Sequence, residues 1–265
     1  MVEHMVARAE RARIALEIAG AGAPLVLVPG AGGRRDGWDP LWQSLTASNR
    51  CVRYDLRGCG ASESVADASF RHADDLRAVL DTVAAPRAAI IGVSMGARIA
   101  VDFALEHPDR VERLVLISPG IADWDWTPRW RQLWDDLVTT TRAGQLDRVR
   151  DMWFRHPLFA TARRDPALAA RLRAQIAADT CHVWLHGDRE RPPARPPIEH
   201  LHELAMPTLL LSGTEDLPDF RLIADIVAAA IPDLDRIDIS DAGHLLHLER
   251  PHNVLSALEN FLARP

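Results

Sequence analysis

Ala88-Ala89-Ile90-Ile91-Gly92-Val93-Ser94-Met95-Gly96 is an apolar run that leads directly into a serine flanked by glycines. The apolar run predicts a buried strand, and the residues after it, 97–104, predict a helix. A serine at such a sharp turn between a strand and a helix is a nucleophile elbow. The glycines on either side permit the strained backbone of the turn and leave room for the neighbouring elements. Because G-x-S-x-G also occurs by chance, the interpretation needs catalytic partners for the serine.

Two later strands lead to a suitable acid and base. Residues Met206–Gly213 predict a buried strand whose following turn carries Asp216, and the short strand Arg236–Ile239 runs into His244. Groups just past the carboxyl ends of parallel strands gather at one edge of a sheet. A serine hydroxyl needs a base to remove its proton, and that base needs an orienting acid. We therefore expect Ser94, Asp216 and His244 to converge.

Each of these assignments has an alternative. Ser94 can be an ordinary turn residue between small neighbours. Asp216 competes with Glu215 and Asp219 in the same acidic loop, where its position in G-x-x-D favours Asp216. His244 competes with His247 and His252, which we expect on or near the following helix as surface or packing residues.

The sequence resembles the α/β-hydrolase superfamily, in the branch with a helical cap, and is similar to small bacterial esterases and enol-lactonases. Besides the elbow, Asp55-Leu56-Arg57-Gly58-Cys59-Gly60-Ala61-Ser62 matches the family's D-x-R-G-x-G-x-S loop, and Gly243-His244 with Glu249-Arg250-Pro251 matches its G-H-x-x-x-x-E-x-P ending. The order Ser, Asp, His is also that of the family. The resemblance implies Ser94 as nucleophile, His244 as general base and then acid, and Asp216 as the residue that orients it. Asp55 and Arg57 are expected to be structural.

The oxyanion hole is less regular. The family usually has His-Gly after its first buried strand, whereas here the strand Leu25–Val28 is followed by Pro29 and Gly30. The hole needs N–H groups from that loop and from the residue after the nucleophile, which assigns the donors to Ala31 and Met95. Proline removes a ring that helps to fix the loop, so the Ala31 amide is the less firmly positioned of the two.

Strands and helices alternate through the first half of the chain, which predicts an α/β fold with a mostly parallel central sheet and helices on both faces. The predicted strands are Ile14–Ala19, Leu25–Val28, Cys51–Tyr54, Ala88–Ile91 and Arg113–Ile117, and the predicted helices are Trp38–Ala47, Phe70–Ala84 and, later, about Phe220–Ala230. Residues 1–120 and 201–265 are predicted to form this core.

Residues 121–200 interrupt the alternation. They contain helix-like segments at Arg129–Thr141, Gln145–Phe154 and Pro166–Leu185, and then the proline-rich stretch 191–197. An insertion of this kind between sheet strands predicts a helical cap, or lid, over the serine, although the prolines equally suit a stiff surface return.

Six of the eight tryptophans lie in this insertion. Trp124 and Trp126 are candidates for substrate contact together with Gly30 and Arg98, whereas Trp130, Trp134 and Trp153 are more typical of packing. A mainly apolar site favours a hydrophobic acyl or aromatic substrate.

These features predict a serine hydrolase that cleaves a carboxylic ester or lactone through an acyl-enzyme, with no metal and no organic cofactor. Two alternatives remain open. One is a non-hydrolytic lyase like the menaquinone-pathway synthase, in which Arg98 grips a carboxylate, with Arg129, Arg155 and Arg163 as further candidates. Arg98 in a surface ion pair is the simpler interpretation. The other is a hydrolase-fold protein that senses a ligand.

Composition limits the partners. The 265 residues carry a formal net charge of −6 and no basic cluster, which argues against nucleic acid, and no apolar run approaches the ~20 residues of a membrane span. The three cysteines, Cys51, Cys59 and Cys181, fit neither a disulfide framework nor a zinc site and are expected to be packed thiols. The first residues lack a signal-peptide core, so we expect a cytoplasmic monomer or homodimer acting on a small molecule.

Overall fold

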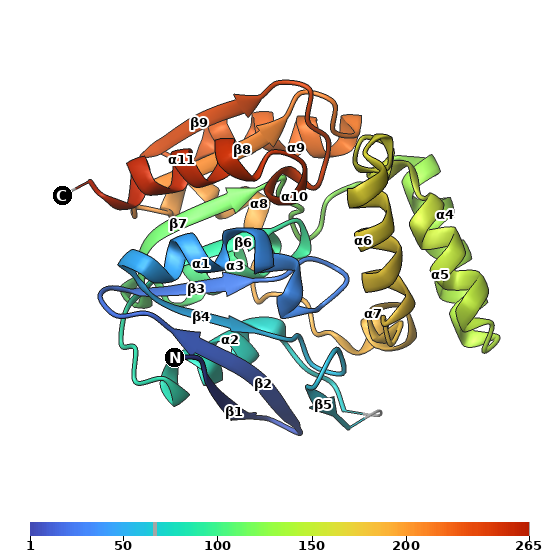
Figure 1. Ribbon diagram of the computed structural model, residues 1–265, viewed down its shortest axis with the longest axis horizontal. Helices are drawn as coiled ribbons and strands as arrows, with labels where there is room; N and C mark the ends of the chain where they lie inside the picture. Colours follow the sequence, from blue (N-terminus) through green and yellow to red (C-terminus); the bar gives the residue numbers. More distant parts are fainter. Residues whose placement is uncertain (66–67, 265) are drawn as a thin grey trace.

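The computed structural model describes residues 1–65 and 68–264, which are organised around one large twisted sheet (Figure 1). Its strands are β1 (Glu3–Ala9), β2 (Ala12–Ala19), β3 (Pro24–Val28), β4 (Arg50–Tyr54), β5 (Glu63–Ser64), β6 (Ala88–Val93), β7 (Val111–Ile117), β8 (Thr208–Gly213) and β9 (Leu234–Ile239). The order across the sheet is β1-β2-β4-β3-β6-β7-β8-β9, with β5 paired to β2. From β4 to β9 all neighbours are parallel, and β2 is antiparallel to β1, β4 and β5. The predicted mostly parallel sheet is confirmed.

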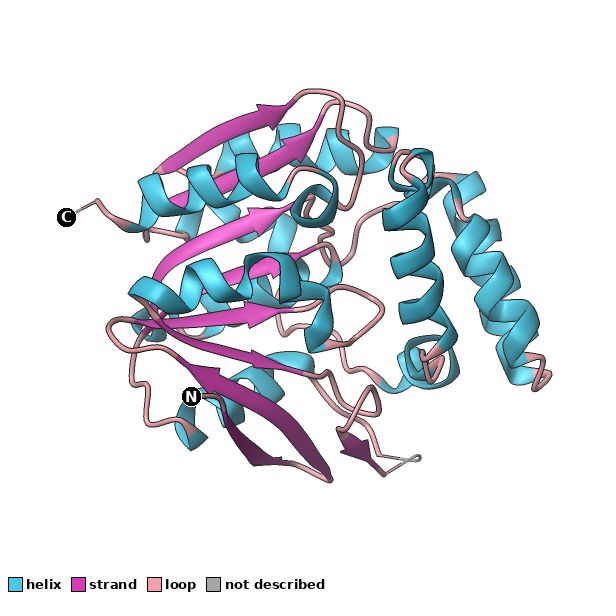
Figure 2. Ribbon diagram, in the orientation of Figure 1, coloured by secondary structure: helices cyan, strands magenta, loops and turns pink. Residues whose placement is uncertain are grey.

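Helices cover both faces of this sheet (Figure 2). On one face lie α2 (His72–Thr82), α3 (Met95–Glu106) and α9 (Pro218–Ala230), and on the other lie α1 (Asp39–Ser48), α10 (Leu246–Glu249) and α11 (Pro251–Leu262). Successive residues of a strand point to opposite faces. In β3, Val26 and Val28 accordingly join the core under α2 and α3, whereas Leu25 and Leu27 join the core under α1 and α11. Both faces of the parallel strands are buried, which explains their unbroken apolar sequences.

The chain between β7 and β8 contains the helices α4 (Pro128–Arg142), α5 (Leu146–Arg155), α6 (Pro166–Ala177), α7 (His182–His186) and α8 (Pro197–His200). The first four lie at one end of the sheet, on the right in Figure 1. The first four enclose a third apolar cluster of their own, which includes Leu137, Trp153 and Trp184. The fifth, α8, packs against α3 of the core, and Ile198 joins the core cluster there.

The predicted helix Pro166–Leu185 is wrong in its extent. The helix α6 ends at Ala177, and the chain turns through Cys181, whose φ of 60° is left-handed, before α7 starts. The carboxylate of Asp179 accepts a hydrogen bond of 2.7 Å from the Cys181 amide and stabilises this turn. Apolar spacing continues through the turn, so the pattern alone hides the break.

The edge strand β1 was not predicted. It pairs with β2 in a hairpin from Glu3↔Ile18 to Ala9↔Ala12, which also makes β2 begin two residues before the expected Ile14. Most side chains of β1 are exposed, so it lacks the apolar signature of the inner strands. The opposite edge strand, β9, is likewise exposed at Asp235–Asp238.

The three cysteines are buried and free of disulfides. Burial raises the pKa of Cys51 and of Cys59 to about 12, and that of Cys181 to about 11. Thiols with such pKa values are poor nucleophiles near neutral pH. Among the described residues, no helix has both the length and the hydropathy that crossing a bilayer requires.

Replacing Gly96 with alanine tests the packing at the start of α3. A Cβ there would lie 2.3 Å from the backbone oxygen of Val28. Alanine normally stabilises a helix relative to glycine, so a loss isolates the clash. We expect Gly96→Ala to lower the free energy of unfolding by about 3 kcal/mol or more in urea titration. Gly187→Ala, whose Cβ would meet nothing within 4 Å, is the control. Equal stability of the two variants would contradict the steric account.

Candidate active site

Ser94 lies at the sharp turn between β6 and α3. Its φ of 54° and ψ of −115° are strained for a residue with a side chain. A Cβ at Gly92 would lie 2.3 Å from the Gly96 oxygen, so the elbow needs glycine at both flanking positions. The backbone of Ser94 is held by a bond from its N–H to Ile117 O (2.9 Å) and by bonds to its own oxygen from the first turn of α3. The hydroxyl is thereby carried at the carboxyl end of the sheet.

The loops after β8 and β9 bring an acid to a histidine. Gly213 allows the loops to approach closely, because a Cβ there would lie 2.3 Å from Gly243 O. Nδ1 of His244 lies 2.9 Å from one oxygen of Asp216 and 3.2 Å from the other, and both side chains are about 1% exposed. Asp216 also accepts a 2.7 Å bond from the Leu217 amide. A carboxylate accepts, so the proton is assigned to Nδ1, and Nε2 is left as the basic nitrogen.

The competing acids have other partners. Glu215 forms an ion pair of 2.6 Å with Arg164 on the inserted segment. Asp219 is buried, and it accepts bonds from the Thr127 hydroxyl (2.7 Å) and amide (3.3 Å) and from the Trp124 indole (3.4 Å). Only Asp216 of the three reaches the imidazole of His244.

Glu249 supports the histidine loop, a role that the sequence analysis did not assign. Its carboxylate accepts bonds from the amides on either side of His244, those of Gly243 (2.7 Å) and Leu245 (3.1 Å). Burial raises the pKa of Glu249 above its ordinary value, against the effect of these bonds. The glutamate of the G-H-x-x-x-x-E-x-P motif therefore fixes the backbone that carries His244.

Ser94 and His244 line the same cavity, which has a volume of about 630 Å³. Within the described chain, His244 Nε2 is buried without a hydrogen-bond partner, and no bond to the Ser94 hydroxyl is recorded. Bonds between a catalytic serine and its base often tighten only when substrate is bound. The ring of Phe220 packs 4.2 Å from the imidazole centroid and limits its movement.

The two expected oxyanion donors also border this cavity, together with Gly30. Met95 is the first residue of α3, where an N–H has no intrahelical acceptor. Neither it nor the Ala31 amide donates a hydrogen bond among the residues that the structure describes. Both amides are therefore available to a developing negative charge, which the helix N-terminus also favours.

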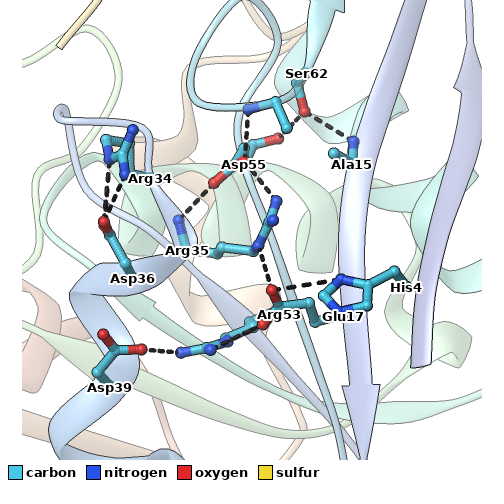
Figure 3. A network of polar contacts seen from close by, with 11 residues as sticks. His4, Ala15, Glu17, Arg34, Arg35, Asp36, Asp39, Arg53, Asp55 and Ser62 are labelled. Atoms are coloured by element: carbon cyan, nitrogen blue, oxygen red, sulfur yellow. Dashed lines mark hydrogen bonds and ion pairs between the residues drawn. The ribbon is translucent and has the colours of Figure 1, made fainter. Parts of the chain in front are cut away.

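A charged network holds the loop that carries Ala31, despite proline in place of histidine at position 29 (Figure 3). Asp55 accepts bonds from the Arg35 amide (2.8 Å), the Arg35 guanidinium (2.6 Å) and the Ala61 amide (2.9 Å). Ser62 donates to the Asp55 carbonyl (2.8 Å) and accepts from Ala15 (2.8 Å). The first residue of the D-x-R-G-x-G-x-S loop thus connects that loop to the loop that carries Ala31.

Arg57 in the same motif is structural, as expected. Two of its nitrogens donate to the carboxylate of Asp75 at 2.6 and 2.8 Å, and both side chains are about 1% exposed. Its guanidinium also lies over the ring of Phe70, 4.4 Å from the centroid.

The tryptophans match their expected positions only in part. Trp126 lines the cavity, but Trp124 does not: its indole donates to Asp219 and its ring packs against the core. Trp130, Trp134 and Trp153, expected to be packing residues, line the cavity as well as packing together. Trp130 stacks on Trp126 with centroids 4.6 Å apart and on Trp134 at 6.1 Å. Helical spacing identified the apolar stripe but not which part of it borders an empty space.

Arg98 lies at the cavity wall, but its charge is already paired. One terminal nitrogen donates to both carboxylate oxygens of Glu190, at 2.8 and 2.9 Å, and the other lies 3.5 Å from Asp102. The side chain is only 17% exposed, so this is a buried pair and not the expected surface pair. Arg129, Arg155 and Arg163 do not line the cavity, whereas Arg34, Arg131 and Arg142 do.

His247 is a buried residue of α10, and His252 is exposed on α11. The ring of His247 packs 5.2 Å from that of Trp38, and the residue borders the cavity beside His244. Burial, with the nearby charges of His244 and Arg171, lowers the pKa of His247 to about 3. It is therefore a neutral packing residue. Within the described ranges, no three His, Cys, Asp or Glu side chains are grouped so that they could hold a metal ion.

Comparison with known proteins identifies the family. A family model described as the alpha/beta hydrolase fold matches residues 23–251. The chain therefore belongs to the α/β-hydrolase family.

Relatives and solved structures agree with this assignment. The chain is 33% identical to 2-hydroxymuconate semialdehyde hydrolase from Pseudomonas sp. (strain CF600), over 95% of this chain and 90% of that protein. The structure of a thermophilic esterase from Thermogutta terrifontis is 25% identical with a TM-score of 0.84, and the match covers 98% of each chain. The enol-lactonase from Burkholderia xenovorans LB400, 24% identical over 98% of this chain and 100% of that one, has the same fold with a TM-score of 0.85. These homologues support hydrolytic activity in general.

Lowering the pH tests the burial of His247. Because its pKa in the folded protein lies below the ordinary value of about 6.5, the unfolded chain binds the proton first as the pH falls. Between pH 7 and pH 5 this residue should therefore cost the folded state about 2 kcal/mol. We expect the free energy of unfolding to fall less over this range in His247→Gln than in the unmodified protein. An equal fall in both proteins would contradict the proposed buried, neutral imidazole.

Proposed function

We propose that this member of the α/β-hydrolase family is a serine hydrolase that cleaves a carboxylic ester or lactone with an apolar acyl or aromatic portion. The observation that carries the proposal is the shared cavity of Ser94 and His244, with His244 oriented by a 2.9 Å contact to Asp216. This is the set of groups that acyl transfer requires: a nucleophile, a base and an orienting acid.

In the first half-reaction, Ser94 Oγ attacks the substrate carbonyl carbon while His244 Nε2 takes the hydroxyl proton. The carbonyl oxygen becomes an oxyanion that accepts hydrogen bonds from the Ala31 and Met95 amides. The carbon–oxygen bond to the leaving alcohol then breaks, and the imidazolium returns its proton to the alkoxide. Asp216 remains a carboxylate and stabilises the imidazolium.

In the second half-reaction, water attacks the acyl-enzyme carbonyl and gives its proton to His244. Collapse of the second tetrahedral intermediate releases the acid, and the proton on His244 returns to Ser94. The charge on oxygen again forms beside the same two amides, so one site serves both steps. No metal or organic cofactor is needed to balance either step.

We also propose that residues 121–200 act as a lid. Side chains from this segment, among them Trp126 and Trp130, line the cavity that contains Ser94. The segment is joined to the core near its start by the bonds of Thr127 to Asp219, and near its end by the pair of Glu190 with Arg98. The aromatic lining supports an apolar substrate, because ligand pockets of this kind use few polar groups.

A lyase of the menaquinone-synthase type is the second candidate function. Whether the arginines that line the cavity are free to bind a carboxylate decides how well this candidate fits. Arg131 and Arg142 of the insertion line the cavity, as that reaction's carboxylate substrates would require. Both form ion pairs, however, with Asp125 (2.6 Å) and Asp188 (2.8 Å), and Arg98 is paired with Glu190. Because these three arginines are already paired with carboxylates, they are less available to a carboxylate substrate, which favours the hydrolase. A ligand-sensing protein would differ from both enzymes because it would not turn over any substrate.

Ser94→Ala tests the nucleophile. We expect kcat for short p-nitrophenyl esters to fall by about 10⁴-fold or more, since loss of a triad member removes the covalent route. Ser118→Ala is the matched control, because the Ser118 hydroxyl is also buried near the elbow but forms no hydrogen bond among the described residues. Undiminished hydrolysis by the Ser94 variant would refute the mechanism, and negligible turnover of a broad ester panel by the unmodified protein would favour the sensing alternative.

Asp216→Asn tests the orienting acid. The amide oxygen can still accept from Leu217, but its NH₂ would donate to His244 Nδ1 and move the ring proton to Nε2. We expect kcat to fall by about 10³- to 10⁴-fold with little change in thermal stability. Glu215→Gln, a neutralisation one residue away that leaves His244 untouched, should retain activity. The proposed role is wrong if both variants lose activity equally.

A further inference from the structure

We propose that the cavity selects uncharged or cationic ring-bearing esters and discriminates against anionic ones. This inference rests on the proposed function and names the charge class of its substrate. It is carried by the pairing of the cations and carboxylates in the cavity wall and by the aromatic surface between them.

Every described arginine that lines the cavity forms an ion pair with a carboxylate. The closest nitrogen–oxygen distances are 2.6 to 2.8 Å: Arg34 with Asp36, Arg98 with Glu190, Arg131 with Asp125 and Arg142 with Asp188. An anionic substrate must therefore share a guanidinium with the carboxylate that already neutralises it, or displace that carboxylate.

The cost of such an exchange is greatest deep in the site. Arg98 and Glu190 are only 17% and 20% exposed, and Arg98 uses both terminal nitrogens in its ion pairs. Removing one partner from a buried pair leaves an uncompensated charge, which is strongly unfavourable. The pairs of Arg131 and Arg142 are about half exposed at the arginine and are weaker barriers.

Carboxylates are in excess around the same cavity. Six carboxylate side chains line it against four guanidinium groups, and His247, which also lines it, is neutral near pH 7 because its pKa is about 3. Two of the six, Asp123 and Asp135, are exposed and have no hydrogen bond or close ion pair to another described residue, although the charge of Asp123 acts on the Arg98 guanidinium. Unpaired negative charge in a cleft repels an anion and attracts a cation.

The aromatic side chains that line the cavity also favour neutral or cationic ligands over anions. The rings of Trp126, Trp130 and Trp134 stack in sequence, with interplanar angles of 22° and 18°. Stacking covers the sides of the rings that face one another. A face left open to the cavity carries the negative end of the quadrupole, so it accepts a planar neutral ring or a cation. Asp135 lines the same cavity as Trp134, so the site presents both a carboxylate and aromatic rings to a ligand.

A matched series of substrates tests the proposal. Phenyl acetates with a para methyl, carboxylate or trimethylammonium group differ in charge, and dividing each kcat/KM by the ester's own rate constant with hydroxide removes the difference in leaving group. We expect the normalised kcat/KM of the anionic ester to lie at least about tenfold below that of the neutral one, and the cationic ester to equal or exceed the neutral one.

Two variants distinguish the effect of a charge at the cavity from the effect of the protein's net charge. Asp123→Asn should raise the normalised kcat/KM of the anionic ester relative to the neutral one by about threefold or more. Asp109→Asn removes the same charge from an exposed residue before β7, at the opposite end of the sheet, and should leave the ratio unchanged. An equal effect of both variants would overturn the assignment to the cavity.

A binding measurement distinguishes failure of this inference from failure of the hydrolase proposal. Quenching of tryptophan fluorescence in Ser94→Ala reports binding of phenylacetate, 2-phenylacetamide and benzyltrimethylammonium without turnover. Weaker binding of the anion than of the amide supports the inference even if the esters are not cleaved. Anion binding as tight as that of the amide overturns it, whatever the outcome of the hydrolysis assays.

Discussion

The geometry of this molecule depends on places where one backbone lies directly against another. Ser94 can hold its left-handed conformation because Gly92 and Gly96 place no Cβ between β6, α3 and β3. Gly213 permits the corresponding contact between the loops that carry Asp216 and His244. Since the strained turn depends on these glycines and on the strands and helix packed around it, the position of Ser94 is a property of the whole core.

Around this fixed centre, the inserted helices form a wall that is attached to the core at several points. The polar contacts of Asp219 and of Arg98 hold the segment where it leaves and rejoins the core, and the ion pair of Arg164 with Glu215 holds it between them. Tryptophan and phenylalanine side chains contribute much of the wall's apolar surface. The charged and the aromatic side chains of the wall therefore have different roles. Charged pairs fix where the wall sits, and aromatic faces determine what it contacts.

The sequence was sufficient for the inner strands of the sheet, the elbow and the approach of Asp216 to His244, because each depends on a strong local signal at or next to a buried strand. It was insufficient where a tertiary partner decides. Trp124 points to Asp219 instead of the cavity, the helix after Pro166 breaks at a turn stabilised by Asp179, and Arg98 is neutralised by a glutamate 92 residues later. The partners of Trp124 and Arg98 cannot be identified from spacing, since each lies more than 90 residues away, and the Asp179 turn is hidden because apolar spacing continues through it.

The two outer strands of the sheet have a consequence for behaviour at high concentration. An open sheet ends in unpaired backbone groups that invite a strand from another molecule. Here β1 exposes Glu3, His4 and Arg8, and β9 exposes Asp235, Arg236 and Asp238. Charges of both signs along each border oppose indefinite strand addition, so the fold resists self-association into fibrils at its most vulnerable margins.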